Sequence, residues 1–383
     1  SIAEANYRER GYHISLEAAP GELLKAARFF DERGFYLAAI VCVDYKEYLE
    51  LVYIFSNHAS LCKVKVSLKI DPAKPVAPTI STVFDCAYWH EREIREFFGV
   101  LFDGHPNMTY LFLHDGIDSY PLRKGQVPVS DEDKRLLGAF RPGEGEDTFF
   151  VNLGPQHPST HGVLRVVLKM DGEYIEEAEP VLGYLHRMHE KMAENRSYQQ
   201  FLPNTGRMDY LGAMSFNLGY VTAVERLCGI AVPDRANYVR VILTELNRLS
   251  SHLLWLGTFL MDLGAMTPFF YCFDDREKIL DIIEMAAGER LTYDYFRFGG
   301  LDHDIPEEFV PAVKKFMPEF KKRLRQYDTL IGKNIIFKNR VRGLGILTKE
   351  NAIAYGVTGP CLRASGVELD ERRRDPYSLY PKL

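Results

Sequence analysis

The stretch ANYVRVILTELNRLSSHLLWLGTFLMDL, residues 236–263, does most to decide the fold of this chain. Its apolar residues occur on nearly every side of the helix it would form, which is typical of a buried helix and not of a surface amphipath. A long buried helix needs other helices packed around it. The second half of the chain is therefore expected to be mainly helical.

Among the charged or titratable residues of this apolar helix, four occur at separations of three, four and ten: Glu245, Arg248, His252 and Asp262. At ~100° per residue they fall within one arc of roughly 100°. A buried charged stripe is costly unless its members pair. It is either an internal ion-pair network or a row of groups that handles protons or tunes a cofactor, because buried titratable clusters also gather at functional sites.

Beyond this helix, most of the chain after Pro180 also reads as helical. The expected helices are residues 184–201, 213–227, 236–263, 274–287 and 306–332. Residues 149–153 and 162–170 look like strands flanking the loop GPQHPSTH, so the helical part is expected to begin with a β hairpin.

The first part of the chain has a different pattern. An amphipathic helix at residues 21–33 precedes three β-rich runs, at 35–43, 49–56 and 62–70. A second helix is expected from residue 81 to 98, ended by Gly99. This predicts an α+β fold with three segments: a small domain with an antiparallel sheet and helices at 1–126, a Pro- and Gly-rich linker at 127–148, and the mainly helical domain at 149–383.

Histidines offer several weak candidates for chemistry. His157 and His161 have the spacing of a helical zinc pair, but Pro158 makes a loop the better interpretation, with hydrogen bonding at the surface as the alternative to catalysis. His90 begins no HExxH motif. His186 and His189 are best explained as part of a solvated helix face.

Composition excludes several classes of function. The net charge of -6 gives no concentrated positive surface for nucleic acid. No apolar run approaches the ~20 residues needed to span a bilayer, and residues 1–10 do not resemble a secretory signal. The six cysteines form no CxxC pair, and GxGxxG is absent, so neither a metal site nor NADH binding is expected of this chain.

Two sets of motifs resemble one enzyme family. NLGPQHPSTHGVLR (152–165), GYLHR (183–187), GRMDY (206–210), NRLSSHLLWLGT (247–258), DLGAMTPFFY (262–271), YFRFGG (295–300) and VTGPCLRASGV (357–367) resemble the D-type subunit of respiratory complex I, NADH:quinone oxidoreductase. WHEREIREFFGVLFDGHPN (89–107) and YPLRKG (120–125) resemble its C-type subunit. The order is that of fused C-type and D-type subunits, and the resemblance implies a D-like fold related to the NiFe hydrogenase large subunit.

The resemblance implies residue roles. His161 and Tyr210 are expected to approach the headgroup of a quinone, ubiquinone or menaquinone, and to donate protons, while Asp262 pairs with the histidine. Arg207 and His252 match positions near the terminal 4Fe-4S cluster of a neighbouring subunit, and Met214 is expected to line the quinone pocket. Two electrons and two protons reduce a quinone, so proton donors at its oxygens suit the chemistry.

The resemblance also implies partners: the subunit that carries the terminal iron-sulfur cluster, a ferredoxin-like iron-sulfur subunit and a membrane-arm quinone-channel subunit. The expected location is the peripheral arm, on the cytoplasmic face of the plasma membrane, in a proton-pumping complex. Asn204 and Met188 depart from the family pattern, and D-type subunits usually continue beyond the position of Leu383. The alternatives are the large subunit of a membrane-bound NiFe hydrogenase-related complex and a non-catalytic scaffold subunit.

Overall fold

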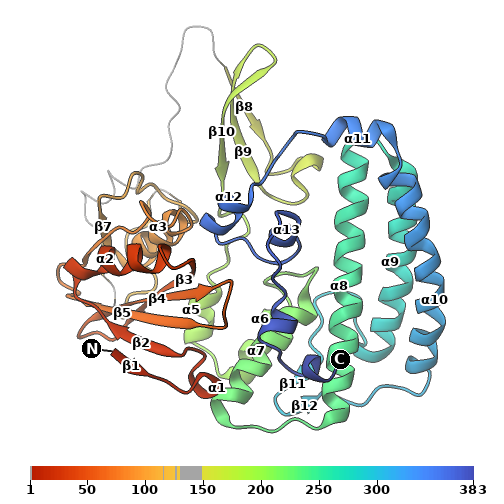
Figure 1. Cartoon of the computed structure of the whole chain (residues 1–383), viewed down its shortest axis with the longest axis horizontal. Coiled ribbons are helices and arrows are strands. Elements are labelled where there is room, and N and C mark those ends of the chain that lie inside the picture. Colours follow the sequence, from red (N-terminus) through yellow and green to blue (C-terminus); the bar gives the residue numbers. More distant parts are fainter. Residues whose placement is uncertain (1, 115, 126, 130–148) are drawn as a thin grey trace. The chain divides into compact units, whose positions relative to one another are not determined.

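The computed structural model describes residues 2–114, 116–125, 127–129 and 149–383 (Figure 1). The chain forms two compact units: unit 1 comprises residues 1–191 and 347–375, and unit 2 comprises residues 192–346 and 376–383. The chain therefore enters unit 2, returns to unit 1 and enters unit 2 again. The sequence-based boundaries at residues 126 and 149 remain predictions, and residues 130–148 of the expected linker lie outside the described part.

Unit 1 contains a five-stranded sheet in the order β1-β2-β5-β4-β3. Its strands are β1 (Ile2–Glu4), β2 (Ile14–Glu17), β3 (Phe35–Asp44), β4 (Leu49–Asn57) and β5 (Lys63–Ile70). The pairs β3–β4 and β4–β5 are antiparallel as predicted, but β2 pairs with β5 in parallel, so the sheet is mixed and the purely antiparallel prediction was wrong. The two extra strands are short and show little burial alternation, the usual signal for a strand.

Two helices of unit 1 accompany this sheet, α2 (Pro20–Asp31) and α3 (Ala87–Phe98), together with the short α1 (Tyr7–Arg10) and the parallel pair β6 (Val76–Pro78) and β7 (Leu101–Asp103). Helix α2 buries Leu23, Ala27 and Phe30 against the core. Helix α3 begins at Ala87 and not at residue 81, because residues 80–86 form turns. It ends at Gly99, in a left-handed conformation, as predicted.

The buried charges of α3 hold a loop in place. Glu96 is 1% exposed, and its carboxylate accepts backbone N–H bonds from Leu111, Phe112 and Leu113 at 3.0–3.3 Å. The Arg92 guanidinium donates to the Thr109 and Tyr110 carbonyls. Backbone groups of residues 109–113 are therefore the main partners of these two charges.

The predicted β hairpin is confirmed in unit 1, where a third antiparallel strand extends it into a meander. It has the order β10-β9-β8, with β8 (Phe149–Leu153), β9 (Arg165–Asp171) and β10 (Tyr174–Val181). The start of the expected linker, residues 127–129, also belongs to this unit: Pro128 pairs with Ser119, and Val129 is buried.

Residues 347–375 complete unit 1 with the short helices α12 (Lys349–Ala354), α13 (Gly359–Ala364) and α14 (Glu371–Arg374). The Cys86 amide donates to the Ala354 carbonyl at 3.3 Å. Asp375 forms an ion pair with Lys63 at 2.9 Å and accepts a hydrogen bond from Tyr7. These contacts join residues 268 to 368 positions apart in sequence, which local sequence patterns do not reveal.

Unit 2 is mainly helical, as predicted. Its long helices are α7 (Ala213–Cys228), α8 (Asp234–Asp262), α9 (Met266–Ala287) and α10 (Phe309–Tyr327), joined by α6 (Tyr198–Thr205), α11 (Ile335–Val341), and the strands β11 (Phe296–Arg297) and β12 (Gly300–Leu301). The predicted helix 184–201 was wrong: α5 (His189–Glu194) ends early, and Ser197 starts α6 with a capping box to Gln200. None of the described helices is long and apolar enough to cross a membrane.

Candidate functional site

The loop between α6 and α7, GRMDYLG at residues 206–212, carries Arg207 and Tyr210. Its first residue must be glycine, because a Cβ on Gly206 would lie 2.7 Å from the Tyr293 carbonyl oxygen. Further along, the Asp209 carboxylate accepts hydrogen bonds from the amides of Leu211 and Gly212, at 3.0 and 3.1 Å. The loop is thus fixed at its start by packing and at its end by an aspartate turn.

Helix α8 holds the end of the same loop through Asn247. This side chain is 2% exposed; it donates to the Leu211 carbonyl at 3.0 Å and accepts from the Met214 amide at 3.1 Å. Asn247 belongs to the NRLSSH motif but is not among the residues predicted to form the site. An amide in the middle of a mainly apolar helix was the available signal, because buried polar groups need partners.

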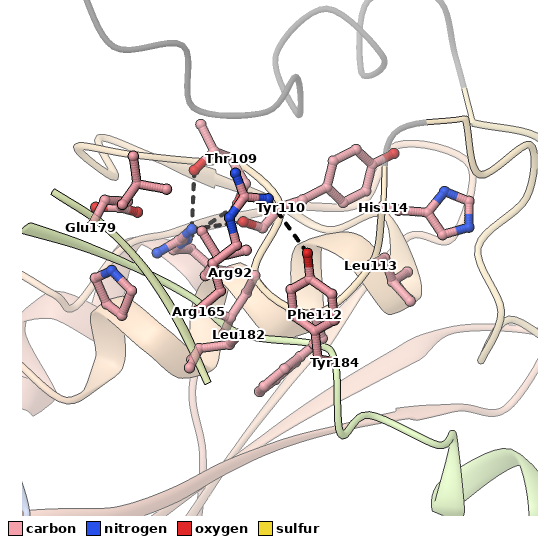
Figure 2. Close-up of a pocket in the computed structure, with 15 residues that line it drawn as sticks. Arg92, Thr109, Tyr110, Phe112, Leu113, His114, Arg165, Glu179, Leu182 and Tyr184 are labelled. Atoms are coloured by element: carbon pink, nitrogen blue, oxygen red, sulfur yellow. Dashed lines mark hydrogen bonds between the residues drawn. The ribbon is translucent and has the colours of Figure 1, made fainter. Parts of the chain in front are cut away.

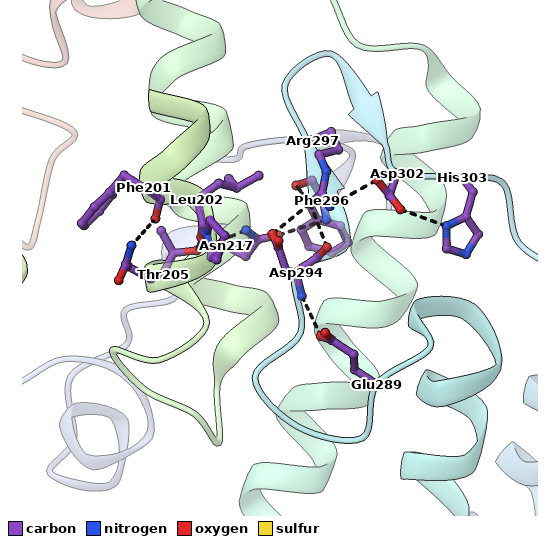
Figure 3. Close-up of polar contacts among 12 residues, drawn as sticks. Phe201, Leu202, Thr205, Asn217, Glu289, Asp294, Phe296, Arg297, Asp302 and His303 are labelled. Atoms are coloured by element: carbon purple, nitrogen blue, oxygen red, sulfur yellow. Dashed lines mark hydrogen bonds and ion pairs between the residues drawn. The ribbon is translucent and has the colours of Figure 1, made fainter. Parts of the chain in front are cut away.

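A second buried amide, Asn217 of α7, ties α6 and α7 to β11 (Figure 3). It donates to the Thr205 hydroxyl at 3.1 Å, and its carbonyl oxygen accepts the Phe296 amide at 3.1 Å. The Thr205 hydroxyl in turn donates to the Leu202 carbonyl at 2.7 Å. The helices on both sides of the 206–212 loop are therefore fixed relative to each other.

The two candidate side chains on the loop face solvent. Tyr210 is 42% exposed, so its phenol is accessible to a ligand. Arg207 is also exposed, and its guanidinium donates to the Pro203 carbonyl at 2.6 Å. Met214, by contrast, is fully buried in the core of unit 2.

The charged stripe of α8 is not buried, which corrects the sequence-based expectation. His252 and Asp262 are exposed, and the side chains of Glu245 and Arg248 are each 34% exposed. Glu245 pairs with Arg248 at 3.2 Å and accepts a hydrogen bond from Tyr380. The prediction of a buried stripe was wrong because this face also carries exposed apolar residues, such as Trp255 at 60% exposure, which resemble core residues in the sequence.

Within unit 2, Asn247 brings the Tyr210 loop to the middle of α8, about 8 Å along the helix axis from His252. Asp262 is the last residue of the helix, about 15 Å further along the axis. Tyr210 and Arg207 therefore share one loop, whereas His252 lies about 140° around α8 from Asn247 and Asp262 lies at the end of the stripe.

His161 lies in unit 1, on the exposed loop between β8 and β9. It follows the 3-10 turn Pro158–Thr160 and has a positive φ of 50°. Gly154 starts the loop, where a Cβ would lie 2.1 Å from the Leu164 carbonyl oxygen, and His157 pairs with Gly162 at its end. The loop predicted from Pro158 and the flanking glycines is confirmed.

The YFRFGG motif surrounds a buried ion pair. The guanidinium of Arg240, 1% exposed, makes two bonds to the Glu225 carboxylate, at 2.7 and 3.1 Å. It also donates to the carbonyls of Arg297 and Gly300, while the Gly299 amide donates to Glu225 at 2.8 Å. Every part of this pair has a partner, so the motif is explained by structure and not by substrate chemistry.

Unit 1 has a pocket of about 590 Å³ between residues 109–114 and the strands β9 and β10 (Figure 2). Arg92, Arg165 and Tyr184 line it, and Gly183 lies so close to the Phe112 carbonyl that a Cβ would be 2.3 Å from that oxygen. The two sets of motifs thus meet at this pocket. None of the six site residues predicted from the sequence lines it.

Comparison with known proteins gives two family matches. Residues 16–132 match the respiratory-chain NADH dehydrogenase 30 Kd subunit, and residues 262–383 match the 49 Kd subunit. The chain is 36% identical to the second fused C/D-type NADH-quinone oxidoreductase protein of Aquifex aeolicus, over 99% of this chain and 71% of the relative. It is 42% identical to the fused C/D-type protein of Methylococcus capsulatus, over 83% of this chain and 57% of the relative.

Separate D-type proteins of NADH-quinone oxidoreductase match the later part of the chain more closely. Identity to the D-type protein of Syntrophobacter fumaroxidans is 56% over 238 residues, 62% of this chain and 64% of the relative. In this and two further D-type proteins, the match covers 59% to 64% of the length of the D-type protein.

Proposed function

Because the chain belongs to the family of fused C-type and D-type subunits of NADH-quinone oxidoreductase, we propose that it helps form the quinone-reduction site of such a complex and supplies protons to the quinone. The family makes the chain a member of an oxidoreductase complex. The proposal adds three specific properties: quinone binding, proton donation and coupling to proton translocation.

The observation that carries the proposal is the 206–212 loop, which presents an accessible phenol from a backbone held at both ends. A quinone oxygen gains negative charge as electrons arrive, and a donor already in position stabilises that charge without reorganising. Tyr210 suits this role, since a phenol keeps its proton near pH 7 until the neighbouring oxygen becomes basic.

His161 is proposed as the second donor and Asp262 as the carboxylate that orients it and stabilises its protonated form. Imidazole exchanges a proton near neutral pH, so it can be recharged from water after each turnover. The exposure of both residues supports this assignment, because each can meet groups that its own unit does not supply.

Arg207 and His252 are proposed to lie near an iron-sulfur cluster held by a neighbouring subunit, where positive charge and hydrogen bonds favour the reduced cluster. Their support is that both side chains are exposed in unit 2 and can meet a neighbouring subunit. The proposed setting is the cytoplasmic, peripheral arm of the complex, beside iron-sulfur and membrane-arm subunits. The fold relationship to NiFe hydrogenases likewise remains a prediction.

Replacing Tyr210 with Phe in the assembled complex tests the proposal. Losing a proton donor typically lowers a rate by 10²–10⁴-fold, so quinone reduction should fall by about 100-fold while electron transfer from NADH to ferricyanide is unchanged. Tyr238→Phe is the matched control, since Tyr238 is a similarly exposed tyrosine of unit 2, at 47%. Unchanged quinone turnover in Tyr210→Phe and in His161→Ala would favour the scaffold alternative.

A further inference from the structure

The short helix α11 is attached to the C-terminal end of α8 by its inner side. Phe337 packs edge-on against Phe259, with ring centroids 6.4 Å apart. Arg340 donates to the Leu263 carbonyl, and the Asn334 side chain caps the helix at the amides of Ile336 and Phe337. Figure 1 shows α11 at this end of unit 2.

The same segment exposes several large apolar side chains. Ile335 and Ile336 are 64% and 60% exposed, and Leu344 and Ile346 are 72% and 73% exposed. Trp255, which is stacked on Phe259 of α8, adds a 60% exposed indole. We call these five side chains the α11 patch. Monomeric proteins rarely gather large apolar residues on their surface in this way, and such patches mark interaction sites.

The charge of the segment that carries most of the α11 patch has one sign. Residues 332–346 contain Lys333, Lys338, Arg340 and Arg342 and no acidic residue, although the chain as a whole carries -6. All four cations are exposed. A surface that complements this one needs an apolar centre with carboxylates around it.

From these observations we propose that the α11 patch docks a protein subunit that presents an apolar surface rimmed by Asp and Glu side chains. A tryptophan and branched aliphatic residues beside arginines match the composition of interface cores. The neighbouring α8 face carries His252 and Asp262 as well as Trp255, and such mixed charges fit a protein surface better than an anionic lipid surface. This inference rests on the proposed function only in taking the partner from the same complex.

Carbodiimide cross-linking of the intact complex tests the chemistry directly, because it joins an amine to a carboxylate in contact with it. Lys338 should form a bond to an Asp or Glu of another subunit, identified by mass spectrometry. Lys321 and Lys322 of α10, which are also exposed, serve as controls and should form at least tenfold less of any such product.

A double variant, Ile336→Asn with Leu344→Asn, should bind the partner subunit identified by cross-linking more weakly. We expect at least tenfold less of this subunit to purify with the double variant than with the wild type. Leu324→Asn is the matched control, a 49% exposed leucine on α10, and should assemble normally. Circular dichroism of each purified chain shows whether folding is intact. Normal assembly of the double variant, or loss only of binding to phosphatidylglycerol vesicles, would overturn the proposal. If only the proposed function fails, Tyr210→Phe leaves quinone turnover unchanged, while the Lys338 cross-link and its loss in the double variant are still observed.

Discussion

Asn247 shows how much a single buried amide contributes to the candidate site. Its two hydrogen bonds to residues 211 and 214 fix the end of the loop that carries Tyr210. The sequence placed Tyr210 correctly on a connection between helices, but it could not show which residue of α8 would hold that connection. Contacts between elements depend on packing, which no local pattern records.

Asn247→Ala should therefore lower both stability and activity. Leaving a buried amide and a buried carbonyl without partners costs about 1–3 kcal/mol of unfolding free energy, measurable by urea denaturation. Quinone turnover should fall as the loop loosens. Asn339→Ala is the control, because Asn339 is exposed and its replacement should change stability by less than about 0.5 kcal/mol.

Glu91 predicts a pH dependence of stability. Burial raises the pKa of this carboxyl to about 7 from an ordinary 4.5, against the opposing effect of hydrogen bonds from Thr79 and Ile80. The folded state therefore holds the proton more tightly than the unfolded chain. Its contribution to stability is present below pH ~4.5 and is lost as the pH rises through ~7.

Glu91→Gln removes this titration while its amide can still bond to Thr79 and Ile80. Between pH ~4.5 and ~7 the wild type should lose up to about 3 kcal/mol of unfolding free energy relative to the variant. Urea titrations of both proteins across this range measure the difference. Parallel pH profiles for the two proteins would contradict the assignment to Glu91, since Glu93, whose pKa burial also raises to about 7, is present in both.

Among the elements, α3 holds residues 109–113 in place through hydrogen bonds from Arg92 and to Glu96. Glu96→Gln keeps the size of the side chain but leaves one acceptor oxygen where three backbone amides now donate to the carboxylate. We expect a loss of about 1–3 kcal/mol in unfolding free energy. Glu368→Gln is the control, because Glu368 is exposed in the same unit and should show little change. Equal stability of the two variants would rule out this role of Glu96.

Periodicity predicted most long elements of both units, including β3 to β5, α7 and α8, because apolar spacing reflects burial directly. It failed where burial was weak or interrupted. Strands β1 and β2 lack clear alternation, and a capping box at Ser197 divides the helix expected at residues 184–201. For α8 the helix itself was predicted correctly, but its exposed face was predicted to be buried. An exposed apolar residue such as Trp255 looks the same in sequence as an apolar residue of the core.

Over the molecule as a whole, the return of residues 347–375 to unit 1 could not be predicted. Gly356 of this segment packs closely and has a positive φ of 63°. A Cβ added there would lie 3.2 Å from the Leu37 carbonyl oxygen and 3.7 Å from the Cys86 sulfur. Burial raises the pKa of the Cys86 thiol to about 11, which slows its reaction with thiol reagents.

Gly356→Val should push this segment away and expose the thiol. We expect at least tenfold faster labelling of Cys86 by iodoacetamide, followed by peptide mass spectrometry. Gly359→Val is matched to it, with a positive φ of 66° but no neighbouring atom within 4 Å of its Cβ, and should leave Cys86 protected. Equal labelling in the two variants would show that residue 356 does not shield Cys86.

The same returning segment is synthesised long after the part of unit 1 that it covers. Ala354 and Gly356 leave the ribosome about 270 residues after Cys86, the residue they cover. At ~5–20 residues per second, the delay is roughly 15–50 s. During translation the surface around Cys86 is therefore uncovered for this time. The delay is long enough for a chaperone to bind there before residues 354–356 are synthesised.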